Sequence, residues 1–181
     1  MSGERSAIVA GLVAAVASLL GCRTVEVESR APADQVRQIE QTLDTLYRAF
    51  CFDAGGDADW PTMRSLFLDG ASFVAPVRDG MLPRAVQADQ FIEDFQSWIA
   101  SSSEGETGLH ERIEHLRIDV YGTVAHAYVL FEAFVPGDQR AVKRGIDSIQ
   151  LVRAGEHWLV ASLTTQFANG DLPVPTRFEG S

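Results

Sequence analysis

Histidine is the side chain best suited to moving protons near neutral pH, and this chain has four. His115 follows Ile113 at a spacing of two in a β-rich run, so it could share the inward face of that strand. A histidine on the sheet face or at an interface is the interpretation that we favour. His157 follows Gly155 and Glu156, which predicts a solvated turn residue.

His126 has a different pattern around it. It alternates with Tyr128, Leu130 and Glu132, whereas the intervening positions are small or apolar and suit packing against helices. We therefore expect His126 to face away from the helices, in a structural or dimer-forming polar cluster with Glu132 and Arg144.

Asp147 and Ser148 are adjacent in a β-rich run, so only one of them can face a cavity. If Asp147 faces inward, the cavity contains a carboxyl group that can transfer protons. If Ser148 faces inward, Ser148 and Gln150 supply neutral hydrogen bonds that orient a ligand. Trp60 and Trp98 are candidates for the wall of an apolar ligand pocket, with simple core packing as the alternative.

Several other chemistries lack their residues. The His, Cys, Asp and Glu positions show no metal-ligand spacing, and no glycine-rich phosphate loop or Gly-x-Ser-x-Gly motif is present, so we expect neither metal nor cofactor. Cys51, between two phenylalanines, is expected to pack as a small hydrophobic residue. The 181-residue chain has a net charge of −10, which argues against nucleic acid as a partner.

The elements that would hold these residues change character along the chain. Apolar residues at helical spacing predict a long helix from Asp34 to Phe50, and Asp59 with Pro61 opens a short second helix that reaches Phe67. A short strand at Ala71–Val77 and a third helix at Asp89–Ser101 follow, and the polar stretch Ser101–Gly108 is expected to be a loop.

Four long β-rich runs then predict an antiparallel meander, because short turns join them: Leu109–Tyr121, Val124–Val135, Ala141–Arg153 and His157–Phe167. Three helices followed by a curved antiparallel sheet form an α+β fold. The domain is expected to cover residues 34–168, and residues 169–181 to be a surface tail.

The N-terminus predicts export. Residues 7–20 form an uncharged apolar stretch of about 14 residues, which suits a signal peptide better than the ~20 residues of a membrane-spanning helix. The segment ends in Leu19-Leu20-Gly21-Cys22, which resembles a bacterial lipobox. Residues 1–21 would be the signal peptide, Cys22 the lipidated N-terminus of a membrane-anchored protein of the cell envelope or periplasm, and residues 22–33 a flexible tether. An ordinary signal peptide or an uncleaved anchor is the alternative.

The order of elements resembles the cone-shaped NTF2-like fold, which includes the SnoaL-like cyclases and the ketosteroid isomerases. Local sequence resembles an uncharacterised bacterial SnoaL-like branch, above all the strand Arg144-Gly145-Ile146-Asp147-Ser148-Ile149-Gln150-Leu151. The resemblance covers about Asp34 to Pro175 and implies the fold more strongly than the function.

The resemblance also implies a cavity between the first helix and the sheet, and a role for Tyr47. This residue matches the isomerase tyrosine that donates a hydrogen bond to a developing enolate. The isomerase base is missing, because Ala75 precedes Pro76 where the catalytic aspartate would lie. A grouping of Tyr47, His115 and Asp147 becomes possible if Asp147 faces inward.

Two functions are consistent with the sequence. The first is a membrane-tethered domain that binds a small apolar molecule or serves as a dimeric assembly module. The second is a cofactor-free lyase, isomerase or cyclase that moves protons with Tyr47 and a His/Asp pair. A homodimer is expected because the His126–Glu132 face is apolar in part and because family members dimerise.

Overall fold

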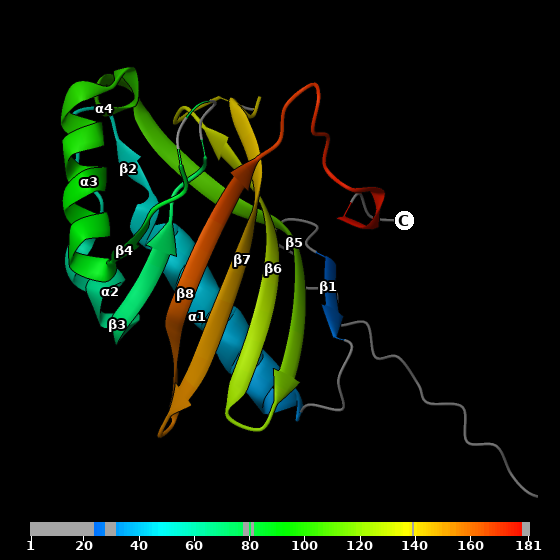
Figure 1. The fold of residues 1–181 in the computed structure, drawn as a ribbon. Helices are drawn as coiled ribbons and strands as arrows, with labels where there is room; N and C mark the ends of the chain where they lie inside the picture. Colours follow the sequence, from blue (N-terminus) through cyan, green and yellow to red (C-terminus); the bar gives the residue numbers. More distant parts are fainter. Residues whose placement is uncertain (1–23, 28–31, 78–79, 81, 139, 179–181) are drawn as a thin grey trace, which may run out of the picture.

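The computed structural model describes residues 24–27, 32–77, 80, 82–138 and 140–178. It has helices packed on one curved, unclosed sheet, which confirms the predicted α+β class (Figure 1). The strand order is β1-β5-β6-β7-β8-β3-β4, with β2 paired to β5. Cys22 and the expected signal peptide lie outside the described residues.

The predicted meander is confirmed and forms the centre of the sheet. Its four antiparallel strands are β5 (Gly108–Tyr121), β6 (Val124–Phe134), β7 (Lys143–Ala154) and β8 (His157–Phe167). Beyond β8 the sheet continues with β3 (Phe67–Val74), which is parallel to β8, and with β4 (Ala85–Gln87), which is antiparallel to β3.

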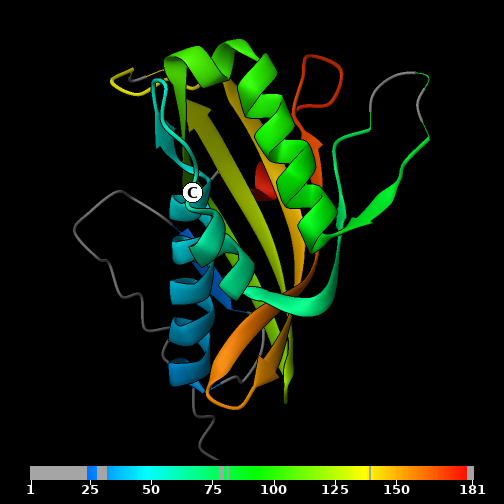
Figure 2. The ribbon, with the colours of Figure 1, turned by 90° about the vertical axis from the view of Figure 1, so that its left-hand side faces the viewer.

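The helices cover one face of the sheet (Figure 2). Helix α1 (Ala33–Phe50) buries its apolar stripe, including Ile39, Leu43 and Leu46 at 0% exposure, against the meander. In α2 (Trp60–Ser65), the Asp59 carboxylate accepts a hydrogen bond from the Thr62 backbone N–H at 3.1 Å, as expected for an N-cap. Helix α3 (Ala88–Ser101) completes the layer with a stacked row of aromatic rings.

Several local predictions need correction. The described residues contain four α-helices rather than three, because Ser103–Thr107, expected in a loop, forms α4. Part of the expected tether, Thr24–Val27, is strand β1, paired in parallel with β5, and Phe52–Asp53 form the short strand β2. The first predicted strand begins at Phe67 and not at Ala71.

The C-terminal segment also differs from the expected surface tail. It ends in a 3₁₀ turn, η1 (Thr176–Phe178), on the side of the sheet away from the helices (Figures 1 and 2). Val174 and Phe178 are buried there against Leu130 of β6. This segment therefore covers part of the outer face of the meander.

Candidate functional site

Strand register decides which polar side chains face the helices. Asp147 of β7 is opposite Val129 of β6 and Thr165 of β8, and it is 5% exposed. Its neighbour Ser148 therefore points to the outer face. Of the two alternatives left open by the sequence, the structure has the carboxyl group on the inside.

Tyr47 and Asp147 meet between α1 and the sheet. The Tyr47 hydroxyl donates a hydrogen bond to Asp147 Oδ2 at 2.5 Å, and Tyr47 is 2% exposed. Tyr47 lies on the inner side of α1, one helical turn after Leu43, so the apolar stripe that packs the helix also directs this hydroxyl at β7. Two of the three expected site residues are thus in direct contact.

Burial controls the protonation of this pair. Removal from water raises the pKa of Asp147 to about 6, while the hydrogen bond from Tyr47 and the nearby Thr165 hydroxyl act in the opposite direction. Burial, and then the charge of Asp147, raises the pKa of Tyr47 well above its ordinary value. At neutral pH Tyr47 is therefore a proton donor and Asp147 is mostly ionised.

One oxygen of Asp147 is poorly satisfied. Oδ1 is buried, and no group among the described residues donates to it with hydrogen-bond geometry, although Thr165 is close enough to affect its pKa. A buried acceptor without a donor is costly, by about 1–3 kcal/mol for a neutral group and more for a charged one. Such groups in a native interior call for an explanation.

The third expected residue, His115, is not in this group. A β-bulge between Ile113 and His115 inserts Glu114, so Ile113 pairs with Phe131 and His115 pairs with Leu130. The extra residue reverses the alternation on which the prediction rested, and His115 faces outward. Its ring packs edge-on against Phe178 at 5.4 Å. The grouping of Tyr47, His115 and Asp147 in one cavity is therefore not formed.

Glu111 of β5 is a site residue that the sequence pattern did not single out. It precedes the bulge and shares the inward face of Ile113, opposite Ala133 of β6. Burial, and then the charge of Asp147, raises the pKa of the partly buried Glu111 carboxyl to about 8, while Lys143 opposes the shift. Alternation with Ile113 was the available signal, but one glutamate in a polar strand did not stand out.

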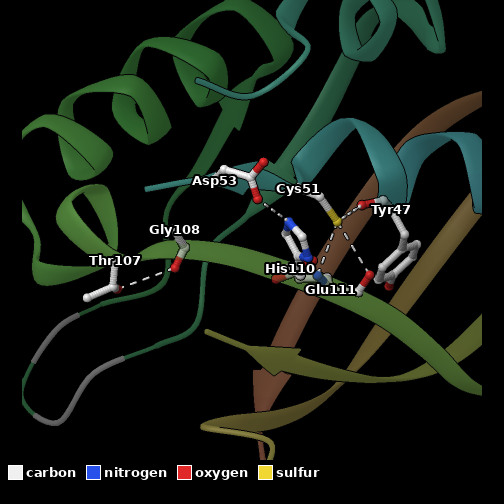
Figure 3. Close-up of polar contacts among 7 residues, drawn as sticks. All are labelled: Tyr47, Cys51, Asp53, Thr107, Gly108, His110 and Glu111. Atoms are coloured by element: carbon white, nitrogen blue, oxygen red, sulfur yellow. Dashed lines mark hydrogen bonds and ion pairs between the residues drawn. The ribbon is translucent and has the colours of Figure 1, made fainter. Parts of the chain in front are cut away.

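Cys51 ties the end of α1 to the strand that carries Glu111 (Figure 3). Its thiol accepts a hydrogen bond from the Glu111 backbone N–H and donates one to the Tyr47 carbonyl, both at 3.2 Å. Burial raises the pKa of Cys51. The thiol thus positions Tyr47 and Glu111 relative to each other, beyond the apolar packing that we expected.

The neighbouring strand β2 carries Asp53, whose carboxylate lies 3.1 Å from His110 Nε2 (Figure 3).

Aromatic rings lie beside Tyr47. The Phe131 ring is 6.1 Å from the Tyr47 ring and 6.1 Å from the Phe167 ring. Gly145 makes this possible, because a Cβ atom there would lie 2.6 Å from the Phe131 ring. The motif that carries the family resemblance thus contains both the acid and the glycine against which Phe131 packs.

Lys143 and Trp98 lie beside this aromatic group. Lys143 Nζ is 2.9 Å from Glu104 Oε1 and lies over the rings of Trp98 and Phe167, at 5.4 and 5.8 Å. Trp98 thus adjoins the candidate site. Trp60 lies farther along the aromatic row, 5.6 Å from Phe95.

The other two expected pocket residues lie on the outer face. Ser148 Oγ is 2.9 Å from His126 Nε2, and Gln150 is exposed. The polar cluster predicted there is formed in part: Glu132 bridges Arg112 and Arg144, each at 3.0 Å, whereas His126 bonds to Ser148. These residues do not share a site with Tyr47 and Asp147.

Two further features bear on ligands. A hollow of about 560 Å³ is lined by residues of the α1–α2 connection and α3, none of which is Tyr47, Asp147 or Glu111: Gly55, Gly56, Asp57, Gln96, Ile99 and Ala100. Within the described part of the chain, no three His, Cys, Asp or Glu side chains come together as a metal site.

Comparison with solved structures shows which fold this is. An NTF2-like protein of unknown function from Shewanella baltica matches with a TM-score of 0.53 at 17% identity, over 78% of this chain and 100% of that chain. A protein of unknown function with a cystatin-like fold from Nostoc punctiforme gives 0.60 at 10% identity, over 78% and 96% of the two chains. A proposed dehydratase of the NTF2-like family from Streptomyces avermitilis gives 0.57 at 15% identity, over 77% and 100%.

The chain therefore has the NTF2-like fold, as its sequence predicts. No protein-family model and no curated protein matches the sequence. Because this fold hosts many functions, the function has to be argued from the residues of this chain.

Proposed function

We propose that this chain binds a small, largely apolar molecule between α1 and the meander, with Tyr47 and Asp147 as its polar contacts. The observation that carries the proposal is the buried Asp147 carboxylate, whose Oδ1 atom lacks a hydrogen-bond donor among the described residues. An apolar interior with a few convergent polar groups is typical of ligand sites. Phe131 and Phe167 supply the apolar surface beside these groups.

Native mass spectrometry of the gently purified domain tests this proposal. We expect a retained small molecule in the wild-type protein and its loss in Asp147→Asn and Tyr47→Phe. Asp119→Asn and Tyr128→Phe are matched controls, because both residues lie on strands of the same sheet outside the candidate site and both should keep the molecule. Equal retention in all variants, or an empty wild-type protein, would count against the site.

Proton transfer is the second candidate function. Asp147, with a pKa of about 6, and Glu111, with a pKa of about 8, lie on either side of neutral pH, so one can accept a proton while the other donates one. In a lyase, isomerase or cyclase of this kind, Glu111 would take the role that the sequence pattern offered to His115. The structural match to a proposed dehydratase from Streptomyces avermitilis is compatible with this chemistry.

Deuterium exchange into an enolisable ketone tests the enzymatic alternative. With 2-tetralone in D₂O, a catalyst should accelerate exchange at the α-carbon, and Glu111→Gln and Asp147→Asn should each remove most of the acceleration. Glu156→Gln, in an exposed turn, is the control. Exchange no faster than in buffer would contradict the enzymatic alternative, and the binding function would remain as the proposal.

We further propose that the protein is exported and anchored through a lipid on Cys22. Metabolic labelling with an alkyne fatty acid should mark the wild-type protein in the membrane fraction, and Cys22→Ala should abolish the label. Among the described helices, none is both long and apolar enough to span a bilayer. Sedimentation of the mature domain tests the proposed homodimer, whose contact would use the part of the outer face that Val174 and Phe178 leave open.

A further inference from the structure

We propose that the ligand of this site carries a protonated amine, which pairs with Asp147, on an apolar body that lies against Phe131 and Phe167. The inference rests on the proposed binding function and adds the chemical class of the ligand. It follows from three features of the geometry: the unused oxygen of the Asp147 carboxylate, the position of Lys143 over the aromatic rings, and the charge of the groups around Asp147.

The first feature is the incomplete hydrogen bonding of Asp147. Asp147 Oδ2 accepts a hydrogen bond from the Tyr47 hydroxyl at 2.5 Å. Asp147 Oδ1 is buried, and among the described residues no donor reaches it with hydrogen-bond geometry. A carboxylate accepts several hydrogen bonds, and charge-assisted ones are the strongest. An ammonium group supplies both the missing donor and the missing countercharge.

The second feature is the position of Lys143, which shows that this aromatic group accommodates an ammonium. Its Nζ lies over Trp98 and Phe167, at 5.4 and 5.8 Å. Glu104 Oε1 lies 2.9 Å from the same Lys143 Nζ atom and forms an ion pair with it. Lys143 is four residues from Asp147 on β7, about 13 Å along the strand. The ion pair with Glu104 therefore keeps the Lys143 ammonium group away from the Asp147 carboxylate.

The third feature is the charge of the groups around Asp147. Tyr47 faces it from α1, Glu111 faces it from β5, and the neutral Thr165 lies beside it on β8. Among the described residues, Lys143 is the cation that acts on Glu111, and it is paired with Glu104. An anionic ligand would therefore meet a buried negative charge, whereas a cation would relieve the repulsion between Asp147 and Glu111.

Proton linkage gives the proposal a second signature. A bound cation favours the ionised forms of Asp147 and Glu111, whose pKa values lie at about 6 and about 8 in the free protein. Binding should therefore release protons, and affinity should rise as the pH increases from 6 to 8. Tyr47 and Cys51, whose pKa values are both raised, remain protonated over this range.

Three probes of nearly equal shape test the proposal: 2-phenylethylamine, 2-phenylethanol and phenylacetate. In NMR titrations of the mature domain at pH 7, we expect the amine to bind at least tenfold more tightly than the alcohol, and the acid not to bind. Asp147→Asn should reduce the preference for the amine to less than twofold. Asp119→Asn, which removes the same charge outside the candidate site, should keep it.

The outcomes separate this inference from the proposed function. Equal binding of the amine and the alcohol overturns the amine inference and leaves a small-molecule site in place. Binding of none of the three probes also overturns it, while a copurified molecule seen by native mass spectrometry would still support the site. Preference for the amine that persists in Asp147→Asn assigns the cation to another carboxylate and overturns the inference as stated.

Discussion

The Tyr47 hydroxyl on α1 lies 2.5 Å from the Asp147 carboxylate on β7, although the two residues are 100 positions apart in the chain. This contact joins the helical layer to the centre of the sheet. It also places a buried hydroxyl donor on a carboxyl group that burial would otherwise neutralise. The same bond thus serves both the packing and the chemistry of the site.

Tyr47→Phe removes this bond while keeping the ring. We expect the free energy of unfolding to fall by about 1.5–3 kcal/mol, the range for a hydrogen bond to a charged partner. Urea denaturation followed by tryptophan fluorescence measures the change. Tyr128→Phe is the control, because its ring lies on the outer face beside His126 and Phe178, and it should change stability by less than about 0.5 kcal/mol. An equal decrease in the free energy of unfolding in the two variants would mean that the Tyr47–Asp147 hydrogen bond does not stabilise the fold.

The sequence predicted the fold from strong local signals. Helical spacing over α1, the capping Asp59 and the short turns of the meander each agree with the structure, because each depends on residues close together in the chain. The second strand of the meander, β6, also has the predicted orientation, with the Ala127 side chain facing the helices and the His126 side chain facing away from them.

The site was harder to predict because it depends on contacts between distant residues. Alternation on β5 fails at the bulge after Ile113, so it does not indicate the face on which His115 lies. Glu111 precedes the bulge and follows the alternation of Ile113, but a single glutamate in a polar strand does not stand out. Whether Asp147 or Ser148 faces inward depends on the pairing of β7 with β6, which local periodicity does not fix.

Stability should decrease as the pH rises from 4 to 8. The pKa values of Asp147 and Glu111 are raised on folding, from 3.8 to about 6 and from 4.5 to about 8. The folded state therefore binds more protons than the unfolded state. The resulting stabilisation is complete when the pH is below the pKa values of the unfolded state, and it is lost as the pH rises through the pKa values of the folded state. Urea midpoints at pH 5, 6.5 and 8 measure this trend.

Glu111→Gln identifies the source of the pH dependence. This variant should remove most of the decrease between pH 6.5 and 8, because glutamine does not titrate. Glu156→Gln, at an exposed turn, should leave the profile unchanged. A wild-type profile that is flat above pH 6.5 would contradict the raised pKa of Glu111.

Gly145→Ala should destabilise the protein by about 1–3 kcal/mol, the usual cost of overpacking a core. The new Cβ atom would lie 2.6 Å from the Phe131 ring and 3.0 Å from the Gln166 carbonyl oxygen. Gly170→Ala is the matched control, because a Cβ atom there meets nothing within 4 Å. Thermal unfolding compares the two, and Phe131→Leu combined with Gly145→Ala should recover part of the loss by making room.

Phe178→Ala should show that the C-terminal segment is part of the folded domain. Phe178 is 3% exposed and packs on Leu130, His115 and Tyr128, so its truncation should cost about 3 kcal/mol, at the lower end of values for buried phenylalanine. Leu172, 49% exposed in the same segment, is the control, and Leu172→Ala should change stability by less than about 0.5 kcal/mol. Chemical denaturation measures both variants. If Phe178→Ala were as stable as Leu172→Ala, the segment would be a loosely attached tail, as the sequence first suggested, and the outer face beneath it would be open to a partner.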